Sequence, residues 1–152
     1  YLRNRLGAQC IPMAESIRKI MKMRQEDKPI VIGFIADQVP LWNNIHYWTD
    51  FLHHDTPVFT GTEKIARKMN FAVYYLDIQR LKRGYYQAEF KLLTEIPKEK
   101  KEFEITETYI RELEKTIQRQ PAFWLWTHNR WKRTREQWLK IVAPVTHKMR
   151  TE

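Results

Sequence analysis

Several histidines lie close to carboxylates, the combination that general acid–base chemistry requires. His46 and Asp50 stand four residues apart, so on a helix they would share a face, as a general base and its orienting carboxylate do. The preceding Asn43-Asn44 and the aromatic neighbours do not favour a helix here. His53-His54-Asp55 could bind a metal ion, but adjacent histidines on a strand point to opposite faces. We interpret both groups as structural or surface features and predict no metal site.

A carboxylate and an amide, Asp37 and Gln38, directly follow the apolar run at residues 29–36. The run is rich in Ile and Val, which predicts a strand buried on both faces, as in a parallel sheet. In open α/β sheets, ligands bind at the carboxyl ends of the strands. Asp37 and Gln38 are therefore candidate ligand-binding residues, and a plain turn-capping role for Asp37 is an equal alternative.

The stretch from residue 124 to residue 133 holds three of the six tryptophans together with three cations. Tryptophan beside arginine suits a membrane interface, where ring and charge share the headgroup layer. It also suits single-stranded nucleic acid, whose bases stack on aromatic rings. A third interpretation is a terminal strand that packs Phe123 and Leu125 inward and leaves the cations in water. No phosphate-binding glycine loop, nucleophile elbow or zinc spacing accompanies it.

The elements that must position these residues are predicted from hydrophobic periodicity. Thr60 and Glu63 form a capping box that would open a short helix ending at Asn70. A strand over residues 71–79 follows, and this order predicts a right-handed parallel crossover from the strand at residues 30–36. The fold class is therefore α/β, a mixed and mostly parallel sheet flanked by helices. Further predicted elements are a helix from Pro12, a strand near residues 45–52, an antiparallel strand over residues 86–92 and a helix over residues 105–117 that stops before Pro121.

Composition sets the outer limits. The 152 residues suffice for one domain with a core, and 43% hydrophobic content argues against disorder. The net charge of +9 permits an anionic partner such as nucleic acid, anionic lipid or a phosphorylated small molecule. No apolar run approaches the length of about 20 residues needed to cross a bilayer. The single Cys10 excludes an internal disulfide and a cysteine-based zinc site.

The order of four motifs resembles the lipid A late acyltransferase family (lauroyl and myristoyl transferases), particularly versions from Bacteroides-like bacteria. The resemblance covers the C-terminal half of such enzymes, as a partial acyltransferase domain over residues 1–138, and leaves residues 139–152 as a basic C-terminal tail. The motifs are Arg5, Ile35-Ala36-Asp37-Gln38, Thr60-Gly61-Thr62-Glu63-Lys64-Ile65-Ala66, and the block from Trp124 to Lys132.

The resemblance implies an enzyme that transfers a fatty acyl chain from acyl carrier protein to a lipid A precursor or a related lysolipid, without a cofactor. In the family, a His-x-x-x-x-Asp/Glu motif supplies the general base. We expect this spacing to be absent at all five histidines, His46, His53, His54, His128 and His147, and His46 to Asp50 is one residue short. The resemblance therefore implies a truncated enzyme with no catalytic residue in this chain, inactive on its own.

By motif position, the resemblance assigns substrate binding to one set of residues, namely Arg5, Asp37, Gln38, His128, Arg130 and Lys132. It places the full-length protein on the cytoplasmic face of the bacterial inner membrane, in contact with an anionic membrane surface, and this fragment in solution. The alternative is a non-enzymatic basic module that binds anionic phospholipid or nucleic acid, of which nucleic acid is the less favoured.

Overall fold

The computed structural model describes residues 7–26 and 29–148, and the side chains only as far as residue 142. The chain divides into two compact units with the boundary between Phe34 and Ile35. The first contains a 3₁₀ turn, Met13–Glu15, that leads into helix α1, Ser16–Gln25. The predicted helix from Pro12 is thus confirmed, and Lys22 and Arg24 occupy its last turn, where cations interact favourably with the helix dipole.

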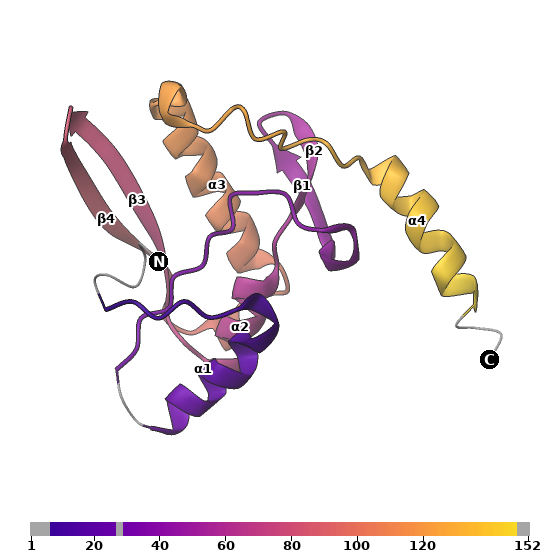
Figure 1. The fold of residues 1–152 in the computed structure, drawn as a ribbon, viewed down its shortest axis with the longest axis horizontal. Helices are drawn as coiled ribbons and strands as arrows, with labels where there is room; N and C mark the ends of the chain where they lie inside the picture. Colours follow the sequence, from indigo (N-terminus) through magenta and orange to yellow (C-terminus); the bar gives the residue numbers. More distant parts are fainter. Residues whose placement is uncertain (1–6, 27–28, 149–152) are drawn as a thin grey trace. The chain divides into compact units, whose positions relative to one another are not determined.

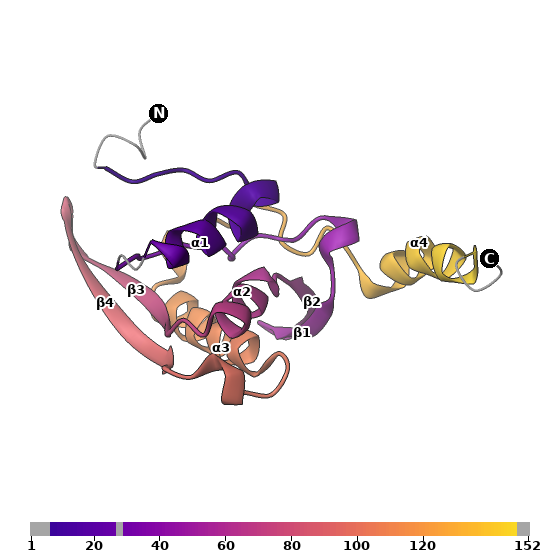
Figure 2. The same ribbon diagram turned by 90° about the horizontal axis from the view of Figure 1, so that it is seen from below.

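The second unit is built around one long helix, α3 (Glu104–Arg119). Two antiparallel hairpins lie on either side of it (Figures 1 and 2). Each sheet has only two strands, so among the described residues all strand pairing is antiparallel. The elements are the hairpin of β1 (Tyr47–Phe51) and β2 (His54–Val58), helix α2 (Gly61–Met69), the hairpin of β3 (Val73–Lys82) and β4 (Tyr85–Thr94), α3, and helix α4 (Arg135–Lys148), with 3₁₀ turns at Trp42–Asn44, Pro97–Glu99 and Pro121–Phe123.

The predicted parallel sheet is wrong, although the α/β class with flanking helices holds. Residues 29–36 form no strand, and the side chains of Val31 and Ile35 are 94% and 66% exposed. Residues 73–82 do form a strand, but its neighbour is β4 and the pairing is antiparallel. A strand is defined by hydrogen bonds to a neighbour, and an Ile/Val-rich composition alone does not supply that neighbour.

A tight turn at Gly84 explains why β3 and β4 pair with each other. Gly84 has a φ of 80°, a conformation that L side chains rarely adopt and that reverses the chain within two residues. The register joins Lys82 to Tyr85 at the turn and Val73 to Thr94 at the open end. The antiparallel strand predicted over residues 86–92 is confirmed as β4.

The apolar face of α3 forms the core of the second unit. Ile110, Leu113 and Ile117 pack with Phe51 and Val58 of the first hairpin, and all five side chains are buried. The spacing of the three α3 residues, three and then four apart, is that of one helical stripe. Each such side chain contributes roughly 1.5–3 kcal/mol of burial free energy. The helix predicted over residues 105–117, ending before Pro121, is confirmed.

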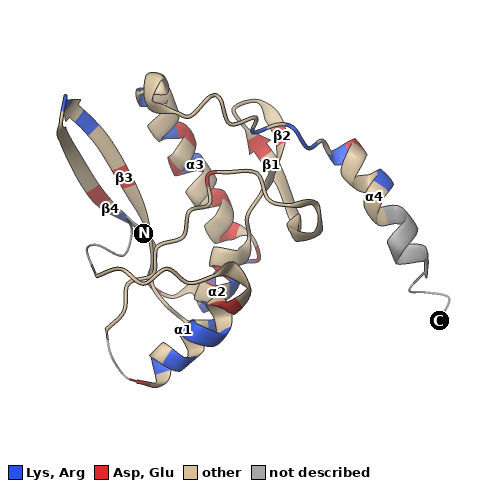
Figure 3. Ribbon diagram, viewed as in Figure 1, with Lys and Arg blue, Asp and Glu red and all other residues tan. Residues whose placement is uncertain are grey.

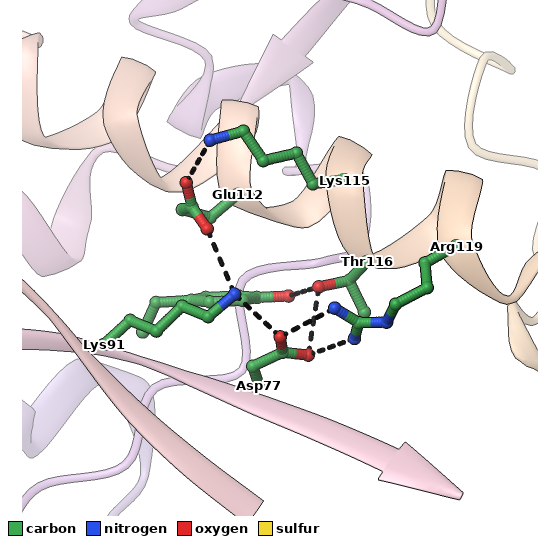
Figure 4. Close-up of polar contacts among 7 residues, drawn as sticks. Asp77, Lys91, Glu112, Lys115, Thr116 and Arg119 are labelled. Carbon is green, nitrogen blue, oxygen red and sulfur yellow. Dashed lines mark hydrogen bonds and ion pairs between the residues drawn. The ribbon is translucent and has the colours of Figure 1, made fainter.

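The opposite side of α3 is joined to the β3–β4 hairpin by charge. Asp77 of β3 is fully buried and accepts hydrogen bonds from Arg119 and Thr116 of α3, while Lys91 of β4 lies 2.8 Å from its Oδ2 atom (Figure 4). Lys91 also lies 3.4 Å from Glu112. The network joins β3, β4 and α3, so it fixes the orientation of the hairpin relative to the helix.

The predicted capping box does not form, because neither Thr60 nor Glu63 caps the N-terminus of α2. Thr60 precedes α2, as expected, but makes no side-chain capping hydrogen bond. The buried Glu63 instead accepts hydrogen bonds from the Phe103 amide at 2.7 Å and from the Thr106 amide and hydroxyl at 2.9 and 2.6 Å. It therefore caps the N-terminus of α3 rather than that of its own helix. The helix ends as predicted at Asn70, which adopts the left-handed conformation.

Helix α4 continues beyond Trp138, the residue at which the sequence suggested that a basic tail begins. Its first residue, Arg135, forms an ion pair with Asp55 of β2 at 2.6 Å. The division of the chain at residue 138 stays a prediction. Among the described helices, none has both the length and the apolar character needed to cross a bilayer.

Candidate functional site

The site forms where residues 37–42 meet residues 124–133, segments that lie far apart in the sequence. Neither segment forms a strand, so the terminal strand considered for residues 124–133 is absent. Helix α3 ends at Arg119 because Pro121 follows, and the chain then passes through the 3₁₀ turn Pro121–Phe123 into irregular turns.

Two tryptophans fix this irregular segment to the core. The Trp131 indole donates a hydrogen bond to Thr56 Oγ1 at 2.9 Å, and its ring lies 6.4 Å from that of Phe51. Trp124 meets the same Phe51 ring edge to face at 6.4 Å. Because both anchors are rigid and half-buried, the residues between and beside them take fixed positions.

Two side chains of this segment contact the loop that carries Asp37. The Val39 amide donates to His128 Nε2 at 3.4 Å. Arg133 donates to the Pro40 carbonyl, and its guanidinium lies 5.4 Å from the centre of the Trp42 ring. These contacts hold the backbone on the C-terminal side of Asp37, so they control where its carboxylate points.

Arg130 is the buried charged residue of the site. It is only 2% exposed, and its guanidinium lies 5.7 Å from the centre of the Phe51 ring. Burial lowers the pKa of Arg130 to about 10, and the nearby Tyr109 and Asp37 partly oppose that change. Arg130 therefore remains a cation at neutral pH, inside the protein.

Asp37 and Arg130 both retain unused hydrogen-bonding capacity. Asp37 Oδ1 and the Nε and Nη1 atoms of Arg130 are buried and have no hydrogen-bond partner. Burial, followed by the charge of Asp37, raises the pKa of the Tyr109 hydroxyl, so that group stays protonated. Asp37, Tyr109 and Arg130 interact electrostatically, although no hydrogen bond or ion pair joins them. We call these three residues the cluster; it combines a carboxylate, a neutral hydroxyl and a cation, and its unpaired atoms could bind a polar ligand.

The structure accordingly brings together three of the six residues that the resemblance assigned to substrate binding: Asp37, His128 and Arg130. Gln38 and Lys132 are exposed, and neither is hydrogen bonded to Asp37, His128 or Arg130. Arg5 lies outside the described residues, so its pairing with Asp37 stays a prediction. His128 contacts the loop of Asp37 rather than an open surface.

Tyr109 and Arg133 were missed by the sequence analysis. Tyr109 lies at helical spacing from Ile105 and Leu113 in the predicted helix, so it fits the apolar stripe, and its hydroxyl is the only signal that distinguishes it. Arg133 lay within the Trp-rich block, but nothing local marked it as the residue that reaches Pro40. Tyr109 and Asp37, like Arg133 and Pro40, are more than 70 positions apart in the sequence, so no periodicity could relate them.

No acid–base pair is found among the described side chains. His46 and Asp50 make no contact with each other, and desolvation followed by Lys64 lowers the pKa of His46. His54 Nδ1 lies 2.8 Å from the Leu52 carbonyl. The same residues contain no group of three side chains able to hold a metal ion.

The expectation that this chain lacks the His-x-x-x-x-Asp/Glu spacing requires one correction. His147 is followed by Glu152 five residues on. The side chain of His147 and the whole of Glu152 lie outside the described part of the chain, so this pair is a matter of sequence alone.

Comparison with protein families agrees with the motifs around Asp37 and Trp124. Residues 1–133 match the family described as bacterial lipid A biosynthesis acyltransferase. The match includes both segments of the site and ends before helix α4 and the His147–Glu152 pair. Comparison with curated proteins and with solved structures gives no match. Because the family match spans most of its length, the chain belongs to the bacterial lipid A biosynthesis acyltransferases.

Proposed function

We propose that this chain binds and orients substrate for a membrane-associated acyltransferase. The reaction moves a fatty acyl chain from the thioester of acyl carrier protein to a hydroxyl of a lipid A precursor or a related lysolipid. The hydroxyl loses its proton to a general base, its oxygen attacks the thioester carbon, and the carbon–sulfur bond breaks. The released thiolate then takes up a proton.

The observation that carries the proposal is the cluster of the buried Arg130 with the half-buried Asp37 and Tyr109, within the region that matches the family. A buried cation beside a carboxylate suits a substrate whose reacting group is polar and whose charge develops during the reaction. No described histidine is hydrogen bonded to a carboxylate, so none of them forms the histidine–carboxylate pair that the family uses. In this proposal the residues of the cluster bind and orient.

The partners follow from the charge. Acyl carrier protein and a phosphorylated lipid precursor are both anionic, and the chain carries a net charge of +9. We place the reaction at the cytoplasmic face of the bacterial inner membrane. Arg5 is assigned to the anionic groups of the substrate, as the resemblance implies, together with the exposed Gln38 and Lys132.

The test is the substitution Asp37→Asn in the catalytically active protein that contains residues 1–152. This substitution keeps the shape and removes the charge, so acyl transfer should fall by about two orders of magnitude, roughly 2.7 kcal/mol of transition-state stabilisation. The melting temperature should change little. Asp50→Asn is the matched control, because that exposed carboxylate lies outside the cluster and its loss should leave turnover normal.

Turnover should be measured from acyl carrier protein thioester to a lipid A precursor, alongside thermal unfolding. A lowered melting temperature with normal turnover in the folded fraction would assign Asp37 a purely structural role and remove it from the site.

A further inference from the structure

The β3–β4 hairpin has one face that no other described element of the second unit covers. Residues at even positions of β3 stand opposite even positions of β4, with Tyr74 paired to Leu92, Leu76 to Phe90 and Ile78 to Ala88. Side chains alternate between the faces of a strand, so these six residues share one face. All six are exposed, Phe90 by as much as 66%.

Every carboxylate of the hairpin lies on the other face. Asp77 pairs with Glu89 at an odd register position, and Asp77 points to α3, where it meets Arg119, while Lys91 of β4 lies on the same face of the hairpin. The uncovered face is therefore apolar and free of negative charge. An apolar surface of this kind on a folded protein marks a site of interaction.

The tip of the hairpin adds positive charge to this face. Residues 79–87 contain Arg80, Lys82 and Arg83 and no acid, and the tip is blue in Figure 3. Three large residues of the tip are more than half exposed: Leu81, Tyr85 and Tyr86. Lys82 Nζ lies 4.3 Å from the centre of the Tyr85 ring, so the tip places a cation directly beside an aromatic ring.

The segment after α3 extends the tip with further aromatic residues. The Arg80 guanidinium lies 5.2 Å from the centre of the Phe123 ring, and Gln120 Nε2 donates to the Arg80 carbonyl at 3.4 Å. Trp126 is held beside this turn by a hydrogen bond from its indole to the Pro121 carbonyl at 2.7 Å. Phe123 and Trp126 are nevertheless more than half exposed, and residues 120–128 contain no acid.

From this arrangement we infer that the β3–β4 hairpin, with residues 121–126 beside its tip, docks onto an anionic phospholipid bilayer. The cations at the tip meet the charged headgroups, and tyrosine and tryptophan occupy the headgroup layer, where such side chains are enriched. The apolar face of the strands then rests against the acyl boundary, as the apolar face of an interfacial helix does. The inference rests on the proposed function, because it supplies the surface that holds the enzyme beside its lipid acceptor.

The experiment is cosedimentation of the 152-residue chain with two kinds of vesicle, one of phosphatidylcholine alone and one of phosphatidylcholine mixed with phosphatidylglycerol. We expect binding to the anionic vesicles that weakens as salt is added, and much weaker binding to the neutral ones. The double substitution Lys82→Gln/Arg83→Gln should weaken binding by roughly 30-fold, about fivefold for each cation near the surface.

Two further variants separate the contributions. Lys98→Gln/Lys101→Gln removes the same charge from exposed positions beyond the other end of the hairpin, and it should change binding much less. Tyr86→Ser keeps the charge and removes an apolar contact, so it should also weaken binding. Brominated acyl chains should quench the tryptophan fluorescence of the bound protein, and Trp126→Phe should remove part of that quenching.

Three outcomes overturn the inference: equal binding to both vesicles, an equal loss in both double variants, or a dimer that covers the hairpin face and does not bind vesicles. Binding of a single-stranded oligonucleotide without binding of vesicles would assign the surface to nucleic acid instead. The readout does not involve acyl transfer, and Asp37→Asn should bind vesicles normally. Failure of the docking surface is therefore distinguishable from failure of the proposed function.

Discussion

Arg119 donates two hydrogen bonds to the carboxylate of Asp77, from Nη2 to Oδ1 at 2.6 Å and from Nη1 to Oδ2 at 3.0 Å. This bidentate geometry is the strongest that arginine forms with a carboxylate. It joins the last turn of α3 to the middle of β3, so the helix that forms the core also carries the exposed hairpin (Figure 4).

Asp77 should make folding stability depend on pH in the acid range. Hydrogen bonding by Arg119, followed by that of Lys91, lowers the pKa of Asp77 from 3.8 to about 2 against the opposing effect of burial. A lowered pKa in the folded state gives stability that is complete above the unfolded value. That stability is lost as pH falls through the folded value, and its size is about 2 kcal/mol.

Asp77→Asn removes that contribution at neutral pH, so its free energy of unfolding should be lower by about 2 kcal/mol. The curve of stability against pH should also be flatter between about pH 4 and pH 2 than that of the parent protein. Urea unfolding at a series of pH values provides the measurement. Coincident curves for the two proteins would show that the pair contributes nothing to stability.

Glu63 should be required for the N-terminus of α3. Its carboxylate accepts from two backbone amides and one hydroxyl of residues 103 and 106. Glu63→Gln removes the charge that favours a helix N-terminus and should cost about 1–2 kcal/mol. Glu102→Gln, an exposed neighbour, is the matched control and should be nearly neutral. Chemical denaturation of both variants tests this, and equal effects would rule out the cap.

Arg133 should control the mobility of the loop that carries Asp37. Lysine in its place cannot present a planar guanidinium to Pro40 and Trp42, so Arg133→Lys should lose about 1 kcal/mol locally. Amide hydrogen exchange in residues 39–44 should then become about fivefold faster, with little change in α3. Lys132→Ala, an exposed neighbour, serves as control. Unchanged exchange in this loop would mean that Arg133 does not position it.

The purified chain of residues 1–152 should not turn over acyl carrier protein thioester. None of its described histidines contacts a carboxylate, and the spacing typical of the family's base occurs only at His147 and Glu152, after the matched residues. Turnover above a buffer blank would contradict this. If such turnover disappeared in His147→Ala, the base would have to be assigned to that pair.

Local signals predicted most elements. The helical stripe of Ile110, Leu113 and Ile117 indicates a buried helix face, which the structure confirms. The alternation in β4 indicates a strand with one apolar face, and the strand forms although that face is exposed. The run at residues 29–36 failed because apolar composition does not specify a hydrogen-bonding partner. The prediction that Glu63 caps its own helix was wrong for a related reason, since its hydrogen-bond partners, residues 103 and 106, lie at the start of another helix.

The site was only partly predictable. The resemblance pointed to Asp37, His128 and Arg130. The sequence could not show that His128 holds the loop of Asp37 or that Arg130 interacts electrostatically with Asp37. That relation depends on Trp124 and Trp131 packing against Phe51, which is a property of the assembled core. Tyr109 joins the cluster for the same reason, because only packing distinguishes it from the apolar residues of its helix.

The turn between β1 and β2 has a consequence for the order of folding. Leu52 and His53 both have positive φ, 52° and 63°, in a two-residue turn of the kind that usually contains asparagine or glycine. The turn is held by α3, since Glu114 accepts from the Leu52 amide at 2.7 Å and Arg111 donates to the Asp50 carbonyl. We therefore expect α3 to form before this hairpin closes, so that the first hairpin in the sequence is among the last elements to become native.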